Sequence, residues 1–269
     1  YAPSGAVKLD DKFIETAQYP VLTRMVRAAV LCNDAALYEH NNSWTIEGDP
    51  MEGALLTLAE KMDVSIIEER KTWARTDTIP FDARHRFMAT LNHDHQEHAF
   101  IFVKGAPEQL LSMCQKQQNE RGDLEPVSHS YWLNKIDEIA RQGQRVLALA
   151  AKEVSSEHTV LQLSDIENNL VLLGMVGMID PPREEAITAV AQCLNAGIQV
   201  KMITGDHSAT AGAIARQIGL KHPDKILTGL ELDRMSDAEL ASVVMENDIF
   251  ARTSPEHKLR LVMALQSHG

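Results

Sequence analysis

The sequence predicts two folded parts: an α+β part at residues 1–179, built on an antiparallel sheet with flanking helices, and a partial α/β part at residues 180–269. Two observations predict this division. Up to residue 179, helical patterns mix with short apolar runs that polar turns separate. Beyond that point strands and helices alternate, which indicates a parallel sheet covered on both faces. Two different folds are therefore expected, joined near residue 180.

The first part is expected to contain both helices and strands. The predicted helices are 21–31, 51–62, 107–114 and 131–141. The predicted strands are 87–91, 99–103, 145–151 and 170–179. Because the polar segment 92–98 separates the first two strands, they are expected to form an antiparallel hairpin. Gly143 follows the last of these helices at a position typical of a C-terminal cap.

In the second part, predicted helices and strands alternate along the chain. The predicted helices are 184–195, 208–218, 237–246 and 255–266. The predicted strands are 198–203 and 248–251. Gly197 is expected to end the first helix, and Ser254 followed by Pro255 is expected to begin the last one.

The composition and charge limit the classes of protein to which the chain can belong. The chain has 269 residues, 44% of them hydrophobic and 24% charged, which is typical of a globular protein. A formal net charge of -12 argues against nucleic acid as a partner, because phosphates need a positive surface. No apolar run approaches the roughly 20 residues that span a bilayer, and no signal peptide is evident. Three widely spaced cysteines fit a reducing compartment, so a cytosolic location is expected.

The strongest chemical signal is an apolar strand that ends in Thr204-Gly205-Asp206 before a helix. Free backbone N–H groups and the helix dipole favour an anion at such a point. Gly205 would let a phosphate approach closely, and Thr204 offers a hydroxyl donor. The alternative is a plain turn in which Asp206 caps the helix, and these residues alone leave both interpretations open.

A second signal lies at the end of the last predicted strand. Arg252 follows that strand, and Lys258 lies in the first turn of the next helix. Both are expected at the carboxyl edge of a parallel sheet, where ligands bind in such folds. A lysine there can neutralise a transferring phosphoryl group, whereas the alternative is an ordinary solvated lysine.

Histidines in the predicted hairpin turn raise the question of a metal site. His93, Asp94, His95 and His98 are all ligand types found around zinc. A solvated polar loop is the default for such a segment, and no second ligand set with zinc-like spacing occurs. We therefore predict no metal site here.

Seven ordered segments resemble the signatures of P-type cation-transporting ATPases, in their calcium-pump-like branch. They include Lys-Gly-Ala-Pro-Glu at 104–108 and Met-Ile-Thr-Gly-Asp at 202–206. The full set is 48–55, 80–88, 104–108, 144–148, 180–183, 202–206 and 250–258. The resemblance covers almost the whole chain. It implies a nucleotide-binding domain over 1–179, and then the C-terminal part of a Rossmann-like, haloacid-dehalogenase-like phosphorylation domain over 180–269.

The resemblance also implies roles for individual residues. Phe81 would stack on adenine, Glu52 would accept a hydrogen bond from the adenine amino group, and Arg145 would reach the polyphosphate. Without the resemblance, Phe81 would be interpreted as a core aromatic residue and Glu52 as a solvated acid. The residues implied around ATP are Glu52, Phe81, Arg86, Lys104, Gly105, Arg145, Asp180, Arg183 and Arg252. Those implied to hold the transferred phosphoryl group are Thr204, Gly205, Asp206 and Lys258.

Two family motifs are not found in the sequence. One is Asp-Lys-Thr-Gly-Thr, which carries the phosphorylated aspartate, and the other is Thr-Gly-Asp-Gly-x-Asn-Asp, which binds magnesium. The resemblance therefore implies a cytoplasmic fragment of an integral membrane pump that binds ATP without hydrolysing it. Most Mg²⁺ ligands, the actuator domain and the transmembrane domain would lie elsewhere, and calcium is the leading candidate for the transported ion. The alternatives are a soluble haloacid-dehalogenase-type phosphatase and a non-catalytic nucleotide-binding module.

Overall fold

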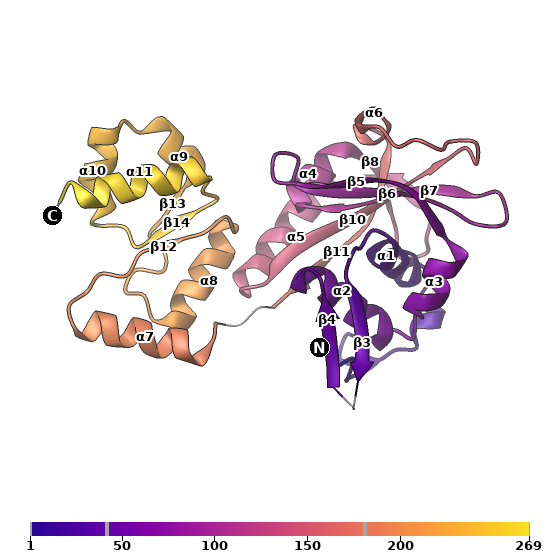
Figure 1. The fold of residues 1–269 in the computed structure, drawn as a ribbon, viewed down its shortest axis with the longest axis horizontal. Helices are drawn as coiled ribbons and strands as arrows, with labels where there is room; N and C mark the ends of the chain where they lie inside the picture. The colour runs from indigo at the N-terminus through magenta and orange to yellow at the C-terminus, as the bar shows by residue number, and fades with distance from the viewer. Residues whose placement is uncertain (1, 41–42, 180–181, 269) are drawn as a thin grey trace. The chain divides into compact units, whose positions relative to one another are not determined.

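The computed structural model describes residues 2–40, 43–179 and 182–268. Its contacts divide the chain into two compact units (Figure 1). Unit 1 comprises residues 1–133 and 146–176, and unit 2 comprises residues 134–145 and 177–269. No helix within the described ranges combines the length and the apolar composition needed to cross a bilayer.

Unit 1 is built on a seven-stranded sheet in the order β5-β6-β7-β10-β11-β8-β9. These strands are β5 (Ala74–Asp82), β6 (Phe87–His93), β7 (Ala99–Gly105), β8 (Cys114–Gln118), β9 (Leu124–Pro126), β10 (Arg145–Val154) and β11 (Leu170–Met178). β6 and β7 form the predicted antiparallel hairpin, but β8 runs parallel to β11. The sheet is therefore mixed, whereas an antiparallel sheet was expected. Helix α4 (Pro107–Met113) ends one residue before the predicted boundary, and Cys114 begins β8.

Helices cover both faces of this sheet (Figure 1). They are α1 (Pro20–Leu31), α2 (Pro50–Lys61), α3 (Ile66–Thr72), α4 and α6 (Leu163–Ile166). The next helix, α5 (His129–Arg141), begins in unit 1, and its residues from 134 on belong to unit 2. On one face, Leu110 of α4 and Ile166 of α6 pack against Leu91 and Val103. On the other, α1 and α2 pack against β6, β7 and β10, so the sheet is the middle of three layers.

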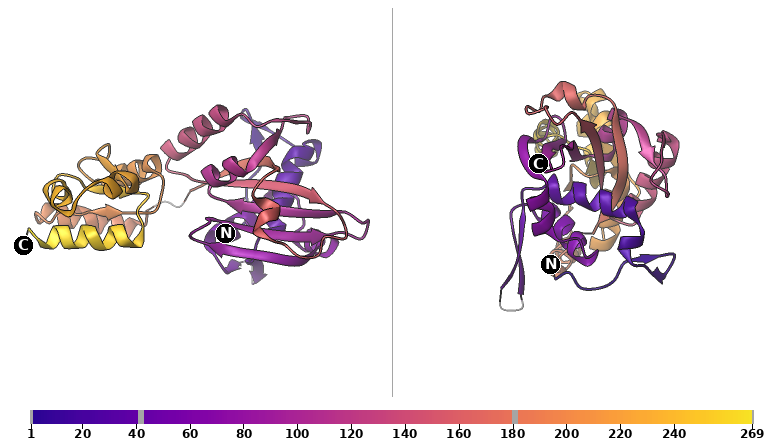
Figure 2. Two further views of the ribbon diagram at one scale, coloured as in Figure 1. Left: turned by 90° about the horizontal axis from the view of Figure 1, so that it is seen from above. Right: turned by 90° about the vertical axis from the view of Figure 1, so that its right-hand side faces the viewer.

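Shorter elements complete unit 1. They are β1 (Lys8–Leu9), β2 (Lys12–Phe13), a 3-10 helix (Thr16–Gln18), β3 (Ala36–His40) and β4 (Ser43–Glu47). β3 and β4 form a separate antiparallel hairpin that projects from the unit (Figure 2). This hairpin was not predicted, because its mostly exposed residues show no buried apolar run.

Unit 2 contains a three-stranded parallel sheet in the order β12-β14-β13. Its strands are β12 (Met202–Ile203), β13 (Ile226–Thr228) and β14 (Ile249–Ala251). Its helices are α7 (Glu184–Asn195), α8 (Ser208–Ile218), α9 (Gly229–Arg234), α10 (Asp237–Val244) and α11 (Pro255–Gln266). Ile249 packs with α7 and α8, whereas Phe250 packs with α9, α10 and α11. The predicted parallel sheet covered on both faces is present.

The strand predicted at 198–203 was too long, because β12 contains only its last two residues. Gly197 ends α7 with φ 77, as predicted, and Ile198 N–H then donates to the Cys193 carbonyl at 2.9 Å. Ile198 therefore belongs to the end of the helix. Lys201 is also outside the strand, where its ammonium binds the carbonyls of Met245 and Asn247.

Candidate functional site

The register of the unit 1 sheet brings several predicted residues to one end of its strands. Phe87 of β6 pairs with Asp82 of β5 on one side and with Gly105 of β7 on the other. Gly105 in turn pairs with Ala148 of β10. This row crosses four strands, so Phe81, one residue before Asp82, lies at the same end of the sheet as Gly105.

Phe81 presents its ring to solvent. The residue lies at a register shift between Ile79 and Asp82, where β5 does not keep the regular pairing with β6. The residue is 63% exposed, the largest exposure of any aromatic residue in this part of the sheet. The interpretation of Phe81 as a core residue is therefore wrong, and the ring can stack on a flat ligand.

The turn after Phe81 is fixed by Asp82 and Arg84. The Arg84 backbone N–H donates to Asp82 Oδ1 at 2.7 Å, and Arg84 Nη2 lies 2.8 Å from Oδ2. Hydrogen bonds from the Arg84 side chain and backbone lower the pKa of Asp82 to about 2. The carboxylate is therefore negative at every physiological pH and does not bind or release a proton there.

The backbones of Arg86 and Gly105 pack closely together at this end of the sheet. Arg86 is exposed with a positive φ of 58, and its carbonyl accepts from Ala106 N–H at 2.9 Å. A Cβ atom on Gly105 would lie 2.5 Å from that carbonyl oxygen. The fold therefore requires a glycine at 105, whatever further role the residue has.

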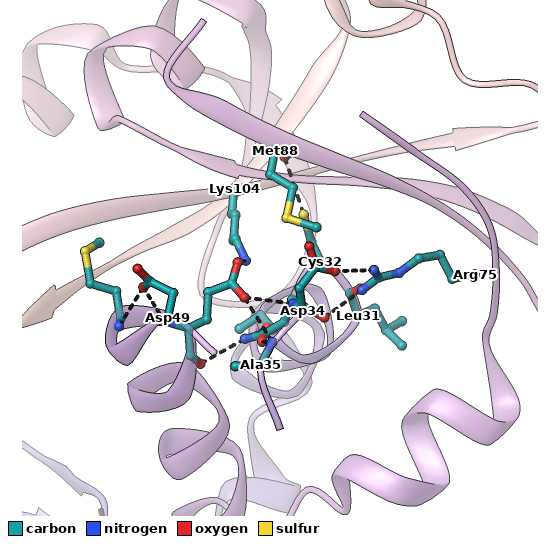
Figure 3. A network of polar contacts seen from close by, with 12 residues as sticks. Leu31, Cys32, Asp34, Ala35, Asp49, Arg75, Met88 and Lys104 are labelled. Carbon is teal, nitrogen blue, oxygen red and sulfur yellow. Dashed lines mark hydrogen bonds and ion pairs between the residues drawn. The ribbon is translucent and has the colours of Figure 1, made fainter. Parts of the chain in front are cut away.

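Glu52 and Lys104 form a mostly buried ion pair, within the polar network of Figure 3. Lys104 is 6% exposed, and its ammonium contacts Glu52 Oε1. Glu52 Oε2 accepts the backbone N–H groups of Asp34 at 2.8 Å and Ala35 at 3.0 Å. The interpretation of Glu52 as a solvated acid is wrong, since its side chain is only 16% exposed. The network holds a charged acceptor and a charged donor at fixed positions.

In unit 2, Thr204 and Asp206 are joined by two hydrogen bonds. Thr204 Oγ1 donates to Asp206 Oδ2 at 2.8 Å and accepts from Asp206 N–H at 3.1 Å. The cap of α8 is His207, whose Nδ1 accepts from Ala209 N–H, so the alternative in which Asp206 caps the helix is wrong. A Cβ atom on Gly205 would meet nothing within 4 Å, so its surroundings here do not require a glycine. The space beside the Gly205 Cα is therefore open.

The other predicted residues of unit 2 lie along or near the same strand ends. Arg252 follows β14, and its N–H donates to the Asp206 carbonyl at 3.0 Å. Lys258 is exposed in the first turn of α11, which Ser254 caps as predicted. Arg145 Nε donates to Asp206 Oδ1 at 2.9 Å. Arg183 is exposed at the start of α7, and Asp180 lies outside the described residues.

A cavity of about 280 Å³ lies at the opposite edge of this sheet. Its walls include Ile198, Lys221, His222 and Asp248, which precede β12, β13 and β14. The cavity is therefore at the amino ends of the strands and shares no residue with the predicted site.

The histidine-rich turn has a structural explanation. Asp94 Oδ1 accepts the N–H groups of Gln96 and His98, and Asp94 Oδ2 lies 2.8 Å from His98 Nδ1. This carboxylate thus closes the β6–β7 turn. Across the described ranges, no group of three or more histidine, cysteine or carboxylate side chains is placed to hold a metal ion.

Two of the three thiols are excluded as nucleophiles. Burial raises the pKa of Cys32 to about 11 and that of Cys114 to about 12. Both therefore remain protonated at neutral pH, and only a thiolate is an effective nucleophile.

The sequence did not reveal which residues hold the Glu52 side chain. Arg75 and Arg70 bind backbone carbonyls of the 31–35 loop, and the N–H groups of that loop bind Glu52. In the sequence, the segment Leu31-Cys32-Asn33-Asp34 is notable only for its resemblance to the family. No local pattern links it to Arg75, which lies 41 residues from Asp34.

A family model matches more than half of the chain. Residues 21–185 match the model described as "P-type ATPase, cytoplasmic domain N". The chain belongs to the P-type ATPase family. The matched span contains the exposed Phe81 ring and the Glu52–Lys104 pair, so both lie in a P-type ATPase N domain.

Curated relatives agree with this assignment. The chain is 43% identical over 252 residues to "Cation-transporting ATPase pma1" of Synechocystis sp., covering 93% of this chain and 28% of that protein. It is 37% identical to "Probable cation-transporting ATPase F" of Mycobacterium tuberculosis, covering 100% of this chain and 30% of that protein. It is 34% identical to "Calcium-transporting ATPase" of Bacillus subtilis, again with 100% and 30% coverage. The chain therefore spans less than a third of each of these P-type ATPases.

Proposed function

We propose that this chain is the ATP-binding part of a cation-transporting P-type ATPase. The observation that carries the proposal is the exposed Phe81 ring at the same strand ends as Lys104, within the span that the N-domain model matches. An exposed aromatic ring at the same strand ends as a buried charged pair suits a ligand that has both a flat base and polar edge groups. Residues 1–179 are the nucleotide-binding domain in this proposal.

Within that domain, Phe81 stacks on adenine and Glu52 accepts from the adenine amino group. Lys104 and Arg86 line the pocket and offset phosphate charge, and Gly105 keeps the backbone turn close to them. Arg145 supplies a planar guanidinium for the polyphosphate.

Residues 180–269 are the C-terminal part of a haloacid-dehalogenase-like phosphorylation domain in this proposal. Thr204, Gly205 and Asp206 receive the phosphoryl group, and Lys258 neutralises its charge, while Arg252 lines the same edge. The open space beside Gly205 supports this role. Asp180 and Arg183 form the hinge between the two domains.

In the whole pump, ATP bound with Mg²⁺ would phosphorylate an aspartate in Asp-Lys-Thr-Gly-Thr, a motif not found in this sequence. The aspartyl-phosphate cycle would drive cation movement through the transmembrane and actuator domains, with this chain on the cytoplasmic side. Calcium is the proposed ion because one aligned relative is named a calcium-transporting ATPase. The chain alone binds ATP without hydrolysing it.

Calorimetric titration of ATP into the chain tests the proposal. We expect saturable binding that Phe81→Ala weakens at least about fivefold, because a stacked base contributes about 1–3 kcal/mol. Phe13→Ala is the matched control: Phe13 is 72% exposed in unit 1 but lies in β2, outside the site. It should leave the affinity unchanged.

Two results would contradict the proposal. A folded wild-type chain that does not bind ATP would remove the nucleotide pocket from unit 1. Phosphate release in proportion to the amount of purified chain would refute the expectation that it cannot hydrolyse ATP.

A further inference from the structure

Arg75, near the start of β5, holds a loop that the proposed site uses. Its Nη1 lies 2.5 Å from Asp34 Oδ1, and its Nη2 donates to the carbonyls of Leu31 at 2.8 Å and Asn33 at 2.7 Å. One guanidinium therefore joins the last carbonyl of α1 to the two residues that follow Cys32. Its side chain is 31% exposed, so these contacts are partly shielded from water.

The loop held by Arg75 is the one that binds Glu52. Arg75 donates to backbone carbonyls of the loop, while the N–H groups of Asp34 and Ala35 both donate to Glu52 Oε2. Asn33 Nδ2 also donates to the Glu52 carbonyl at 2.9 Å. Figure 3 shows Arg75, Asp34, Ala35 and Lys104 in this single network. Moving the loop would thus move the carboxylate.

The network leaves the carboxylate little acceptor capacity. A carboxylate has about four lone-pair positions, two on each oxygen. Two backbone N–H groups occupy those of Oε2, and the Lys104 ammonium occupies one on Oε1. A single position remains, on Oε1, and its direction is set by the two N–H groups on the other oxygen.

We propose that Arg75 is a positioning residue that, through the Asn33–Ala35 loop, aims this remaining acceptor of Glu52 at the 6-position of a purine base. The proposal rests on the proposed function and adds to it the group that selects the base. An amino group at that position donates to Glu52, whereas the carbonyl oxygen of a 6-oxopurine faces a carboxylate. Arg75 itself touches no nucleotide.

A lysine could not replace Arg75 in this role. The planar guanidinium presents several donors at once, and here they reach two carbonyls and one carboxylate. An ammonium is a compact point charge and would hold fewer of these partners in one plane. Arg75→Lys therefore keeps the charge and loosens the loop.

The test is the ratio of the dissociation constants for inosine triphosphate and ATP, measured by calorimetry on the full chain. These nucleotides carry the same ribose and phosphates and differ only in the base, at the 6-substituent and in the proton that N1 carries in inosine. We expect the wild type to prefer ATP, and Arg75→Lys to reduce that preference by about tenfold, since a hydrogen bond to a charged group is worth roughly that factor. In a Glu52→Gln background, the same change should no longer alter the ratio.

Arg27→Lys is the matched control. Arg27 also forms an ion pair in unit 1, with Glu69, and its side chain is 32% exposed. It should leave the ratio unchanged. Asp34→Asn tests the same role from the other side of the ion pair. It removes the negative charge that Arg75 binds but retains the Asp34 N–H that donates to Glu52. It should lower the ratio as Arg75→Lys does, and thermal unfolding verifies that each variant is folded.

The possible results separate the two proposals. If the wild type does not bind ATP, the proposed function fails and this inference fails with it. If it binds both nucleotides equally, ATP binding stands and base selection by Glu52 is overturned. Equal weakening of both nucleotides by Arg75→Lys, or a persistent effect in the Glu52→Gln background, would overturn the role of Arg75.

Discussion

Asp82 and Arg84 show at the scale of single residues how the turn after Phe81 is held. The pKa of Asp82 is lowered to about 2, first by the Arg84 side chain and then by the Arg84 N–H. A group whose pKa is lower in the folded state stabilises the fold above its unfolded pKa. That contribution is lost as the pH falls through the folded value. This turn is therefore expected to loosen only in strong acid.

Replacing Arg84 with alanine should raise the pKa of Asp82 toward the ordinary value of about 4, because the largest cause of the shift is removed. Carboxyl chemical shifts followed by NMR from pH 7 to pH 1.5 would measure it. Arg24→Ala, which removes an exposed arginine on α1, is the control and should leave this titration unchanged. An unchanged pKa in Arg84→Ala would show that another group holds the carboxylate.

The residues of the site were predicted better than the contacts that they make with one another. Glu52 and Lys104 were both named from family motifs, yet their ion pair joins positions 52 residues apart and could not be foreseen. Phe81 was predicted to be available for stacking, and its exposure fits that role. Gly105 was assigned to the ligand, whereas the structure gives it a packing requirement against the Arg86 carbonyl. Contacts of this kind depend on the register of the sheet, which motifs do not encode.

Helix α11 makes a prediction at the scale of an element. Ser254 accepts the His257 N–H at 3.2 Å, and His257 Nδ1 accepts the Ser254 N–H at 3.0 Å. Ser254→Ala removes one of these two bonds, so it should lower the free energy of unfolding of unit 2 by about 1 kcal/mol. Chemical denaturation followed by circular dichroism would measure this change.

Ser242→Ala is the control for the loss of a serine hydroxyl. Ser242 is exposed inside α10, and its hydroxyl donates to the Glu239 carbonyl in the preceding turn. Alanine is the better helix former there, so this change should be neutral or slightly stabilising. Equal effects of the two substitutions would mean that the α11 cap contributes nothing specific.

The eight predicted helices were placed to within a few residues, but the short helices α3, α6 and α9 were not predicted, even though Ser65 and Thr228 cap two of them. Several short strands were missed as well. β5 was not predicted, since it contains Pro80, and a proline in a strand normally argues against one. The structure accommodates Pro80 because β5 is the edge of the sheet. β8 and β13 are short and leave no alternating pattern in the sequence, so only tertiary pairing defines them.

The whole molecule has separate cores. Among the residues that the structure describes, three clusters of buried apolar residues lie in unit 1 and two in unit 2, and none of these clusters contains residues of both. We therefore expect two unfolding transitions in differential scanning calorimetry. ATP should raise the midpoint of the transition of unit 1 only, because a ligand stabilises the part that binds it.

Phe81→Ala should reduce the shift that ATP causes without removing either transition. One cooperative transition for the whole chain, or an equal shift of both transitions with ATP, would contradict the independence of the two units.

The division into two units also has an optical consequence. All three tryptophans and all four tyrosines of the chain precede residue 134, so every one of them belongs to unit 1. Trp73 is packed edge-on against the rings of Phe100 and Phe102 in that unit. Tryptophan and tyrosine fluorescence therefore reports on unit 1 alone, because unit 2 contains neither residue. Comparing that signal with the far-ultraviolet dichroism of all helices would reveal the state of unit 2 without any attached dye.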